Sequence, residues 1–468
     1  MAARLNICFV HLFVLITQLV AQNTHLMTMS IISGWQFQCA NTTCLPFATI
    51  RTLNIRNCQI ACLDQVQCQA ITFHQSSSNC ELFSNILNQN RNMSINAGTI
   101  TMIDMSGTRL SNGSITVSTT ATTTACSSLF LDPNTYSTGS TPFSMAVADV
   151  NNDNHLDIII ANSASNNVGV LFNIGNGTFR SQTVYSVGTN PRSVAVADVN
   201  NDNKSDIVVA NYNSNTTSVL LNTGNGTFFN QAIYSVGANP VSIVIADMNN
   251  DNKSDIIVAN YNSNNIGILF NTGNGTFLNH SIFEVGSYPI SLVVADVNSD
   301  NKPDIIVAKE YSNNISIILN MNNGVFLNKA IQVNSTHIIS IAVADVNNDN
   351  NPDIITVNCD ANNIGILLNA GNGTFRNQIT RSVGAYPRAV AVGDINSDNI
   401  PDIVVVNAAV SNVGVLLNTG NGTFLNQTTY SVGDTPASVA LIDVNNDNKL
   451  DIIVANAGSD EINVILHC

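Results

Sequence analysis

The stretch DVNNDNKSD, residues 198–206, places three aspartates between the apolar segments SVAVA and IVVAN. Only 10% of the residues in the chain are charged, so this local concentration of carboxylates requires an explanation. The same pattern begins again at Asp149, Asp247, Asp296, Asp345, Asp394 and Asp443. With Asp198 included, each start lies 49 residues after the previous one, so the chain contains seven copies of one unit.

One copy, residues 193–240, contains four short runs of β-branched and apolar residues, separated by segments rich in Gly, Asn and Asp. Such runs predict antiparallel strands. A four-stranded unit that repeats every 40 to 50 residues is typical of a β-propeller blade. We therefore predict a mainly β fold, a seven-bladed β-propeller over residues 126–468. A parallel β-helix is the alternative, but its repeats are much shorter than 49 residues.

The ends of the repeated region indicate how the ring closes. Counting back 49 residues from Phe179 and Tyr185 leads to Phe130 and Tyr136, whereas the last copy stops after its third strand. We therefore predict that the segment containing Phe130 and Tyr136 supplies the fourth strand of the seventh blade.

Three cysteines lie in the repeated region. Cys126 occupies the repeat position that follows Cys468, so the two are predicted to form a disulfide at the junction of the ring. The alternative joins Cys126 to Cys39 or Cys44 and leaves Cys468 free. Cys359 is predicted to be unpaired in both cases.

The acidic loops have the composition of calcium sites. Positions 1, 3, 5 and 9 of each loop carry Asp, Asn, Asp and Asp, and position 7 can add a backbone carbonyl. Such hard oxygen ligands with a net charge near −3 suit Ca²⁺, whereas zinc prefers His and Cys and Mg²⁺ keeps more water. The loops hold 21 of the 31 acidic residues, and seven Ca²⁺ ions would nearly neutralise the formal charge of −15.

We thus predict about seven Ca²⁺ ions. The predicted ligands, loop by loop, are Asp149, Asn151, Asp153, Asp157, Asp198, Asn200, Asp202, Asp206, Asp247, Asn249, Asp251, Asp255, Asp296, Asn298, Asp300, Asp304, Asp345, Asn347, Asp349, Asp353, Asp394, Asn396, Asp398, Asp402, Asp443, Asn445, Asp447 and Asp451.

The segment SVAVADVNNDNKSDIVVANYNSNTTSVLLNTGNGTF, residues 193–228, resembles the FG-GAP/VCBS-type propeller repeat, which is related to the calcium-loaded blades of integrin α-subunit heads. The resemblance covers residues 126–468. It implies that each metal loop joins the first and second strands of its blade, with ligands at positions 1, 3, 5 and 9. The family often has Gly at position 6, where this chain has Asn, a residue that also tolerates a left-handed backbone.

The sequence before the propeller divides into three parts. Residues 1–21 resemble a secretory signal peptide, with an N-terminal anchor helix as the alternative. Residues 22–104 contain six cysteines between Cys39 and Cys80, which indicates a small disulfide domain in an oxidising compartment. Residues 105–125 are rich in Ser and Thr and are predicted to be a linker.

Within the cysteine-rich part, NCQIACLDQVQCQAITFHQSSSNCELF, residues 57–83, resembles the core of a PAN/Apple domain. The resemblance implies a small α+β domain that binds proteins or glycans outside the cell. It also implies disulfides that join Cys58 to Cys80 and Cys62 to Cys68. The same resemblance leaves the pairing of Cys39 and Cys44 open.

We predict a secreted recognition or adhesion protein that acts as a monomeric ring and binds an extracellular protein or glycan. The metal loops and the hairpins of sequence NGTF are expected on one face of the ring. The loops between blades and the turns between second and third strands are expected on the other face, which is the candidate ligand face. The candidate ligand residues are Tyr212, Tyr261, Tyr311, Arg192 and Arg388.

Other functions fit the sequence less well. The 16 Lys and Arg residues form no run, so nucleic acid is not an expected partner, and no later segment predicts a membrane span. A lectin-like propeller is the alternative, although the one Trp, Trp35, lies outside the ring. An extracellular enzyme is less favoured, because His155, His280, His337 and His467 occupy different repeat positions and no nucleophile pair is evident.

The pair Asn-Gly inside TGNGTF predicts two-residue hairpins in which both turn residues have positive φ. This pair is found at Asn176, Asn225, Asn274, Asn372 and Asn421.

Overall fold

The computed structural model describes residues 128–321, 325–335 and 337–468, together with five strands before residue 105. The chain separates into two compact units, Met1–Ala125 and Cys126–Cys468. No helix in the described part of the chain is long and apolar enough to cross a membrane.

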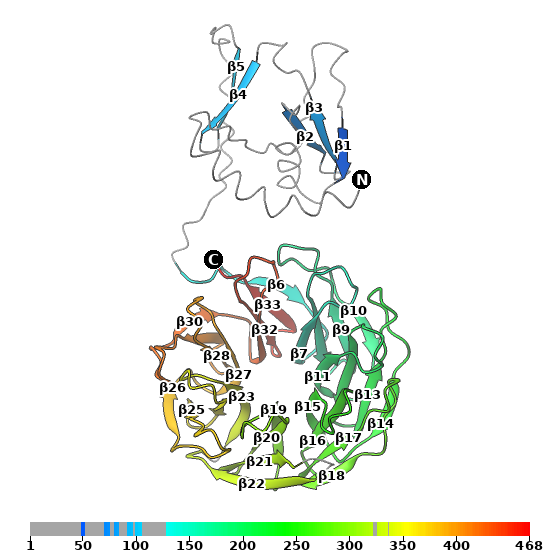
Figure 1. Cartoon of the computed structure of the whole chain (residues 1–468), viewed down its shortest axis with the longest axis vertical. Helices are drawn as coiled ribbons and strands as arrows, with labels where there is room; N and C mark the ends of the chain where they lie inside the picture. The colour runs from blue at the N-terminus through cyan, green and yellow to red at the C-terminus, as the bar shows by residue number, and fades with distance from the viewer. Residues whose placement is uncertain are drawn as a thin grey trace. The chain divides into compact units, whose positions relative to one another are not determined.

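The second unit is a closed ring of seven four-stranded antiparallel sheets (Figure 1). The first strand of each blade lies innermost, against the first strands of the neighbouring blades. These strands are β7 (Pro142–Ala148), β11 (Pro191–Ala197), β15 (Pro240–Ala246), β19 (Pro289–Ala295), β23 (Ile338–Ala344), β27 (Pro387–Gly393) and β31 (Pro436–Ile442).

The second strands are buried along their whole length. They are β8 (Asp157–Asn162), β12 (Asp206–Asn211), β16 (Asp255–Asn260), β20 (Asp304–Lys309), β24 (Asp353–Asn358), β28 (Asp402–Asn407) and β32 (Asp451–Asn456). Neighbouring blades cover both faces of each of these strands. For example, Ile257 of one blade and Ile305 of the next belong to one core cluster. This two-sided burial explains their continuous apolar sequence, because a strand with a solvent-exposed face would alternate.

The outer half of each blade has two strands. The third strands are β9 (Asn167–Leu171), β13 (Thr216–Leu220), β17 (Asn265–Leu269), β21 (Asn314–Asn320), β25 (Asn363–Leu367), β29 (Asn412–Leu416) and β33 (Glu461–Ile465). The fourth strands are β10 (Thr183–Ser186), β14 (Ala232–Ser235), β18 (Ser281–Glu284), β22 (Phe326–Gln332), β26 (Ile379–Ser382), β30 (Thr428–Ser431) and β6 (Asn134–Ser137). The seven-bladed, mainly β fold predicted from the sequence is confirmed.

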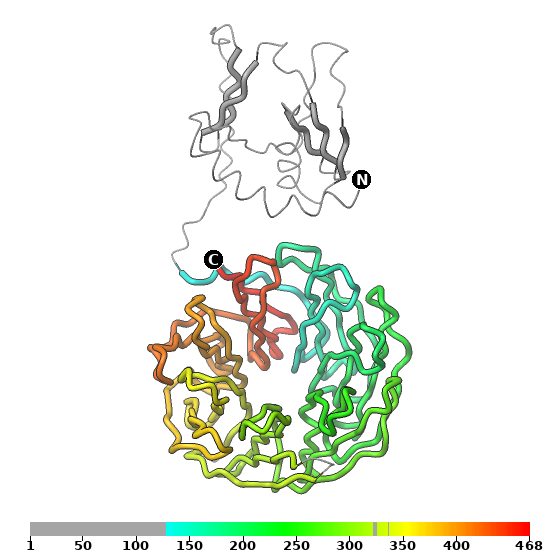
Figure 2. The backbone as a smooth tube through the Cα atoms, viewed as in Figure 1, coloured from blue at the N-terminus to red at the C-terminus, as the bar shows by residue number. Residues whose placement is uncertain are grey.

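The seventh blade is completed by the N-terminal strand of the ring, as predicted. Strand β6 pairs antiparallel with β33, so the sheet order is β31-β32-β33-β6. Outside these strands Phe130 bridges to His467, and the amide of Cys468 donates to the carbonyl of Leu129 over 3.0 Å. Figure 2 shows the cyan start of the ring beside its red end.

Aromatic pairs join neighbouring blades at five of the seven junctions. Tyr185 of β10 meets Phe228 of the following blade edge to face, with ring centroids 5.0 Å apart. At the closure Tyr136 of β6 meets Phe179 in the same way at 5.4 Å. Phe130, 4% exposed, meets Tyr430 of the sixth blade at 5.3 Å. Such pairs add to the stabilisation that comes from burial, so the closing segment packs like an ordinary part of the repeat.

The predicted cysteine pairs lie partly outside the described residues. Cys468 is disulfide-bonded, but Cys126 is not among the described residues, and its pairing stays a prediction. Non-reducing peptide mapping of the protein is expected to yield a peptide that joins Cys126 to Cys468, because the segment after Cys126 lies antiparallel to the C-terminal residues. A peptide that joins Cys126 to Cys39 or Cys44 would contradict this pairing.

The prediction of two-residue hairpins was wrong in detail. The amide of Thr223 donates to the carbonyl of Thr227 at 2.9 Å, so the loop has three residues, Gly224, Asn225 and Gly226. The two glycines have φ of 98° and 77°, whereas Asn225 is not among the residues with positive φ. The Asn225 side chain instead accepts hydrogen bonds from the hydroxyls of Thr223 and Thr227. Among the five pairs named above, only that of the first blade has positive φ at both residues, Asn176 and Gly177.

In the N-terminal unit the described strands form two small sheets. Strands β1 (Ala48–Arg51), β3 (Asn79–Phe83) and β2 (Ala70–His74) form an antiparallel sheet in that order, and β4 (Arg91–Asn96) pairs with β5 (Thr99–Asp104). Cys80 lies in β3, opposite Phe73 of β2. The predicted partner Cys58 and the predicted pair Cys62 and Cys68 lie outside the described residues, as do the predicted signal peptide and linker.

Candidate functional site

Each acidic loop connects the first and second strands of its blade, and its last aspartate opens the second strand. In the second blade this loop runs from Asp198 to Asp206. Positions 4 and 6 of all seven loops have positive φ, near 60°, and are occupied by Asn or Ser. Asn adopts this left-handed conformation more easily than other residues, apart from Gly. The recurrent Asn residues therefore shape the tight loop that turns the carboxylates together.

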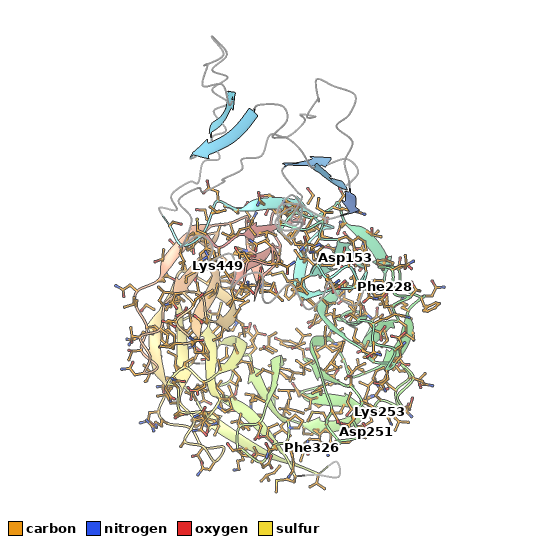
Figure 3. The ribbon with its side chains drawn as sticks, turned by 45° about the horizontal axis from the view of Figure 1, so that its top comes forward. Asp153, Phe228, Asp251, Lys253, Phe326 and Lys449 are labelled. Atoms are coloured by element: carbon orange, nitrogen blue, oxygen red, sulfur yellow. The ribbon has the colours of Figure 1, made fainter. Side chains whose placement is uncertain are left out.

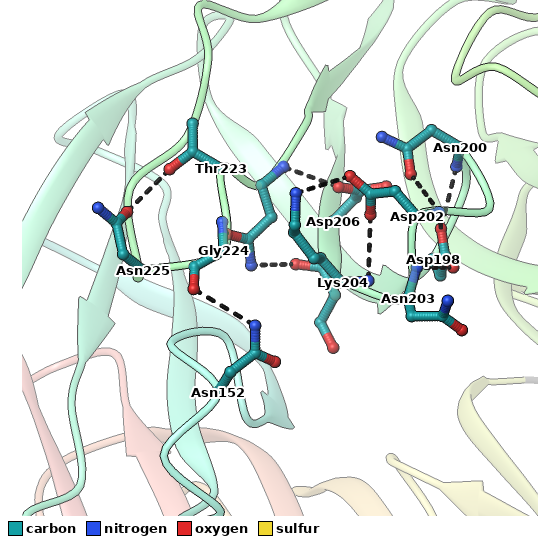
Figure 4. A network of polar contacts seen from close by, with 12 residues as sticks. Asn152, Asp198, Asn200, Asp202, Asn203, Lys204, Asp206, Thr223, Gly224 and Asn225 are labelled. Carbon is teal, nitrogen blue, oxygen red and sulfur yellow. Dashed lines mark hydrogen bonds and ion pairs between the residues drawn. The ribbon is translucent and has the colours of Figure 1, made fainter.

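The loop of the second blade shows how its side chains are held (Figure 4). Asp198 accepts hydrogen bonds from the amides of Asp202 and Asn203, at 3.2 and 2.7 Å. The amide oxygen of Asn200 also accepts from the amide of Asp202, at 3.1 Å. The Asp202 carboxylate accepts from the amide of Lys204 at 3.1 Å. Oxygens at positions 1, 3 and 5 are therefore fixed by the backbone of their own loop.

The aspartate at position 9 is buried in every blade, with no exposed surface. In the second blade Asp206 accepts hydrogen bonds from the amides of Val199 and Asn222, at 3.0 and 2.7 Å. Burial raises the pKa of Asp206 to about 6, those two hydrogen bonds oppose the rise, and the carboxylates of Asp202 and Asp198 add to it. The same burial raises the pKa of Asp157, Asp255, Asp304, Asp353 and Asp451 to about 6 and raises that of Asp402.

An asparagine on the adjacent hairpin links each loop to the previous blade. Asn222 donates its side-chain amide to the carbonyls of Ser205 and Val150, at 2.9 and 2.8 Å. Val150 lies in the loop of the preceding blade, and its carbonyl also accepts from the amide of Gly226 at 3.1 Å. The acidic loops and the NGTF hairpins therefore share one face. In the seventh blade His467 takes the place of this asparagine and contacts the Ile395 carbonyl at 2.9 Å.

Lysines stand beside some of the loops. Lys253 lies 3.2 Å from Asp251 of its own loop, and Figure 3 shows the two side chains side by side. Lys204 and Lys302 make equivalent pairs with Asp202 and Asp300. These pairs are about one third exposed, so each contributes about 1 kcal/mol or less. They offset only part of the charge that three carboxylates bring to a loop.

The donor set of each loop fits calcium, whereas the side-chain geometry requires some adjustment. The three carboxylates and one amide oxygen are hard ligands, and the buried carboxylate at position 9 favours a nearby cation. However, in the described part of the chain the carboxylates of one loop do not all approach within 4.8 Å of one another. Ligands about 2.4 Å from one ion lie within about 5 Å of each other, so bound Ca²⁺ would draw these side chains inward.

The opposite face contains two arginines stacked on one phenylalanine. The guanidinium carbon of Arg192 lies 4.2 Å from the ring centroid of Phe143, and that of Arg388 lies 4.7 Å from the same centroid. Arg192 is also 5.1 Å from the ring of Tyr212. Two of the predicted ligand residues, Arg192 and Arg388, are therefore brought together by closure of the ring. Phe143, which connects them, was missed.

Tyrosines continue around this face through the third to fifth blades. Tyr261 meets Tyr288 at 5.0 Å, Tyr288 meets Tyr311 at 6.3 Å, and Tyr311 stacks on His337 at 5.0 Å. The hydroxyl of Tyr261 donates to Glu310 at 2.5 Å, and burial together with this carboxylate raises the pKa of Tyr261. Tyr311 does not occupy the repeat position of Tyr212 and Tyr261, because Glu310 stands there.

Six overlapping matches to the FG-GAP-like repeat model begin at the acidic loops of the first six blades. They cover residues 149–209, 198–258, 247–307, 296–356, 345–405 and 394–454. The chain belongs to the FG-GAP-like repeat family. Residues 41–106 match the PAN domain model, which confirms the suspected resemblance of the N-terminal region. Together an FG-GAP-like propeller and a PAN domain indicate an adhesion or recognition protein, and PAN domains are typical of extracellular proteins.

Solved structures share the propeller fold at low sequence identity. Virginiamycin B lyase from Staphylococcus aureus is 15% identical, with a TM-score of 0.53 over 72% of this chain and 99% of that chain. BBS1N, solved in complex with ARL6DN, is 11% identical, with a TM-score of 0.55 over 73% of this chain and 98% of that chain. At these identities the likeness shows the fold alone. No curated protein sequence matches the chain significantly.

The FG-GAP-like propeller also contains a polar cluster that its sequence did not indicate. His337 contacts Glu310 at 3.0 Å and Asp360 at 2.9 Å, and Cys359 lies beside them. The sequence made no Cys/His pair evident, but the structure brings His337 and Cys359 together. These residues occupy different repeat positions, but a loop between blades places His337 next to the turn that follows β24. Cys359 is fully buried, which does not suit attack on a substrate.

Cys359 is expected to be inert in the folded protein. Burial raises the pKa of its thiol to about 11, so about one thiol in a thousand would be ionised at pH 8. In the native protein, a disulfide reagent such as DTNB should therefore gain no signal from Cys359, and unfolding should release one equivalent. The Cys359→Ser variant should lack that equivalent. Fast reaction of Cys359 in the native protein would show an activated thiol and would favour an enzyme.

Proposed function

We propose that this protein is an extracellular calcium-binding recognition protein that binds a protein ligand with the face opposite its metal loops. The two faces have separate roles in this proposal. The loops hold calcium and keep adjacent blades together, whereas the opposite face supplies the side chains that contact the ligand. No catalytic step is part of this function.

The observation that carries the proposal is the distribution of differences among the seven copies. The loop face repeats the same residues in nearly every blade, whereas the opposite face carries aromatic and charged side chains that only some of the blades have. Tyr288, Tyr311 and Tyr386 on this face are 40%, 64% and 48% exposed. Large exposed aromatic residues are frequent among the residues that contribute most to binding at protein interfaces.

The backbone at these tyrosines supports the same interpretation. Tyr288, Tyr311 and Tyr386 have φ of 54°, 55° and 55°, a left-handed conformation that is costly for a bulky residue. The positions of Tyr288 and Tyr386 carry Asn190 and Asn239 in other blades, where Asn adopts that conformation easily. Strained residues of this kind concentrate at functional sites.

Calcium is proposed as the structural ion of the seven loops. The supporting observations are the recurrent set of three carboxylates and one amide per loop, the burial of the aspartate at position 9, and the position of each loop beside the hairpin of the next blade. In this role calcium stabilises the contacts between blades and acts on ligand binding indirectly.

The proposal is tested by capture from conditioned medium on the immobilised secreted protein in calcium. Three forms are compared: the unchanged protein, a Tyr288→Ala/Tyr311→Ala variant of the proposed face, and an Ile233→Ser/Ile282→Ser variant. Ile233 and Ile282 are similarly exposed, at 58% and 54%, but lie on the fourth strands at the outer edge.

We expect a ligand to bind the unchanged protein and the outer-edge variant but not the tyrosine variant. Chelation of calcium should also release this ligand, because the ring would lose its folded structure. A ligand that binds all three forms equally, or is lost only from the outer-edge variant, would contradict the proposed face.

A further inference from the structure

The second residue of each innermost strand is the extra residue of a β-bulge. In the second blade Pro191 pairs with Asn211 and Ser193 pairs with Ala210, which leaves Arg192 between two partners. The same register shift occurs in all seven blades. The seven bulged residues are Phe143, Arg192, Val241, Ile290, Ile339, Arg388 and Ala437. Bulges redirect side chains and are frequent beside functional sites, so one ring of positions around the axis is free to vary.

Two of these seven positions carry a positive charge. Arg388 of the sixth blade and Arg192 of the second blade flank Phe143 of the first, and the intervening seventh blade contributes the small Ala437. The other three bulged residues are aliphatic. The charge is therefore concentrated on one side of the ring axis, in a chain whose formal net charge is −15.

Neither arginine has an acidic partner among the described residues. Arg192 donates its Nε to the side-chain oxygen of Asn190 at 2.8 Å, which orients the guanidinium and leaves its terminal nitrogens available. Arg388 makes no hydrogen bond within the described part of the chain, and its packing partner is the ring of Phe143. Both side chains are half-buried. Burial lowers the pKa of each, and for Arg192 the charge of Arg388 lowers it further.

Two half-buried guanidinium groups beside each other, without a counter-ion, are unfavourable for the folded protein alone. A bound carboxylate would remove this cost, because guanidinium donates two parallel hydrogen bonds to a carboxylate. The ring of Phe143 would contact the methylenes of an Asp or Glu side chain. A long polyanion such as a sulfated glycan would need a basic surface, and the 16 Lys and Arg residues of the chain form no run.

We propose that Arg192 and Arg388 bind a carboxylate side chain of the protein ligand, against the ring of Phe143. This inference rests on the proposed function, since it names the group on the ligand that the face recognises. The bulge at the second position of each innermost strand presents the recognising side chains, and closure of the ring brings those of the sixth, first and second blades together.

The first test uses acetate as the carboxylate probe on the full protein in calcium. The melting temperature is followed as acetate replaces chloride at constant ionic strength. Acetate should raise the melting temperature of the unchanged protein saturably, by about 2 °C, and should have no effect on the Arg192→Gln/Arg388→Gln variant. Arg180→Gln is the matched control, because Arg180 is exposed and outside the bulged positions. Equal curves in acetate and chloride for the unchanged protein would overturn the inference.

The second test removes the charge without a ligand. Arg388→Met keeps a long side chain over Phe143 and removes the repulsion, so the melting temperature should rise by about 1 to 3 °C in chloride. A fall in the melting temperature would show that Arg388 has a structural role, and this would contradict the inference.

A third test distinguishes this inference from the proposed function. Immobilised peptides with a single Glu should bind the unchanged protein at least tenfold more tightly than the Arg192→Gln/Arg388→Gln variant. Selective binding of sialylated or sulfated oligosaccharides, with no binding of the peptides, would show that the arginines bind an acidic glycan and would contradict the inference. A captured protein ligand whose binding needs Tyr288 and Tyr311 but not the arginines would refute the proposed carboxylate site and would leave the proposed function in place.

Discussion

Chelation of calcium is expected to lower the melting temperature of this protein by about 15 °C. At 1 mM free Ca²⁺ and a dissociation constant near 0.1 mM, each loop would gain roughly 1.4 kcal/mol, and seven loops roughly 10 kcal/mol. That sum is comparable with the whole unfolding free energy of an ordinary domain. Without the ion, the buried aspartates at position 9 would stay beside two other carboxylates each.

The measurement is a thermal unfolding scan with EDTA, followed by addition of Ca²⁺ at about 0.1 to 1 mM, which should restore the original curve. The matched control is Mg²⁺ at the same concentration, which should restore little, because Mg²⁺ keeps more of its water. Identical unfolding curves with and without EDTA would show that the loops do not depend on a metal.

Loss of the two closing aromatic residues should have the second largest effect. Phe130→Ala/Tyr136→Ala removes a buried ring and a partly buried ring that join the seventh blade to its neighbours. We expect a loss of about 5 kcal/mol of unfolding free energy, since buried Phe→Ala changes alone cost about 3 to 5 kcal/mol. The ring would then open at the pairing of β6 with β33.

Chemical denaturation of the full protein measures this loss. Leu131→Ala is the control from the same segment, because Leu131 is 40% exposed and its loss should cost about 0.5 kcal/mol or less. Unfolding curves of the double variant that match those of the control would mean that the N-terminal segment does not hold the ring closed.

The blades were predictable from the sequence because every copy repeats the same physical requirements. The strand that begins at Asp206 must be apolar on both faces, and the loop before it must turn through left-handed Asn residues. Both requirements leave a visible pattern at a period of 49 residues. The closing strand was predictable for the same reason, since Phe130 and Tyr136 occupy repeat positions that the last copy lacks.

The cluster around Phe143 was harder to predict, because Arg388 lies five periods further along the chain. Phe143 and Arg388 are far apart in the chain, and only closure of the ring makes them neighbours. All three members of this cluster nevertheless share one repeat position, so comparison of the copies position by position could have found Phe143. His337 and Cys359 share no position, and their contact depends on loops that differ between blades.

The hairpin prediction failed for a local reason. The pair Asn-Gly favours a two-residue turn, but the preceding glycine in Gly224-Asn225-Gly226 also adopts positive φ. That freedom allows a three-residue loop, and the Asn side chain is then held by hydrogen bonds from two threonines. The pair Asn-Gly correctly predicted a turn, but the preceding glycine, Gly224, determined the length of the loop.

The most direct test of the calcium assignment is the number of ions that the folded protein binds. Native mass spectrometry of the chelated protein, titrated with Ca²⁺, counts them without reference to stability. We predict seven ions, and six for an Asp202→Ala/Asp206→Ala variant that disables the second loop. An unchanged mass over a titration to 1 mM Ca²⁺, or the same number of ions in this variant, would contradict the assignment.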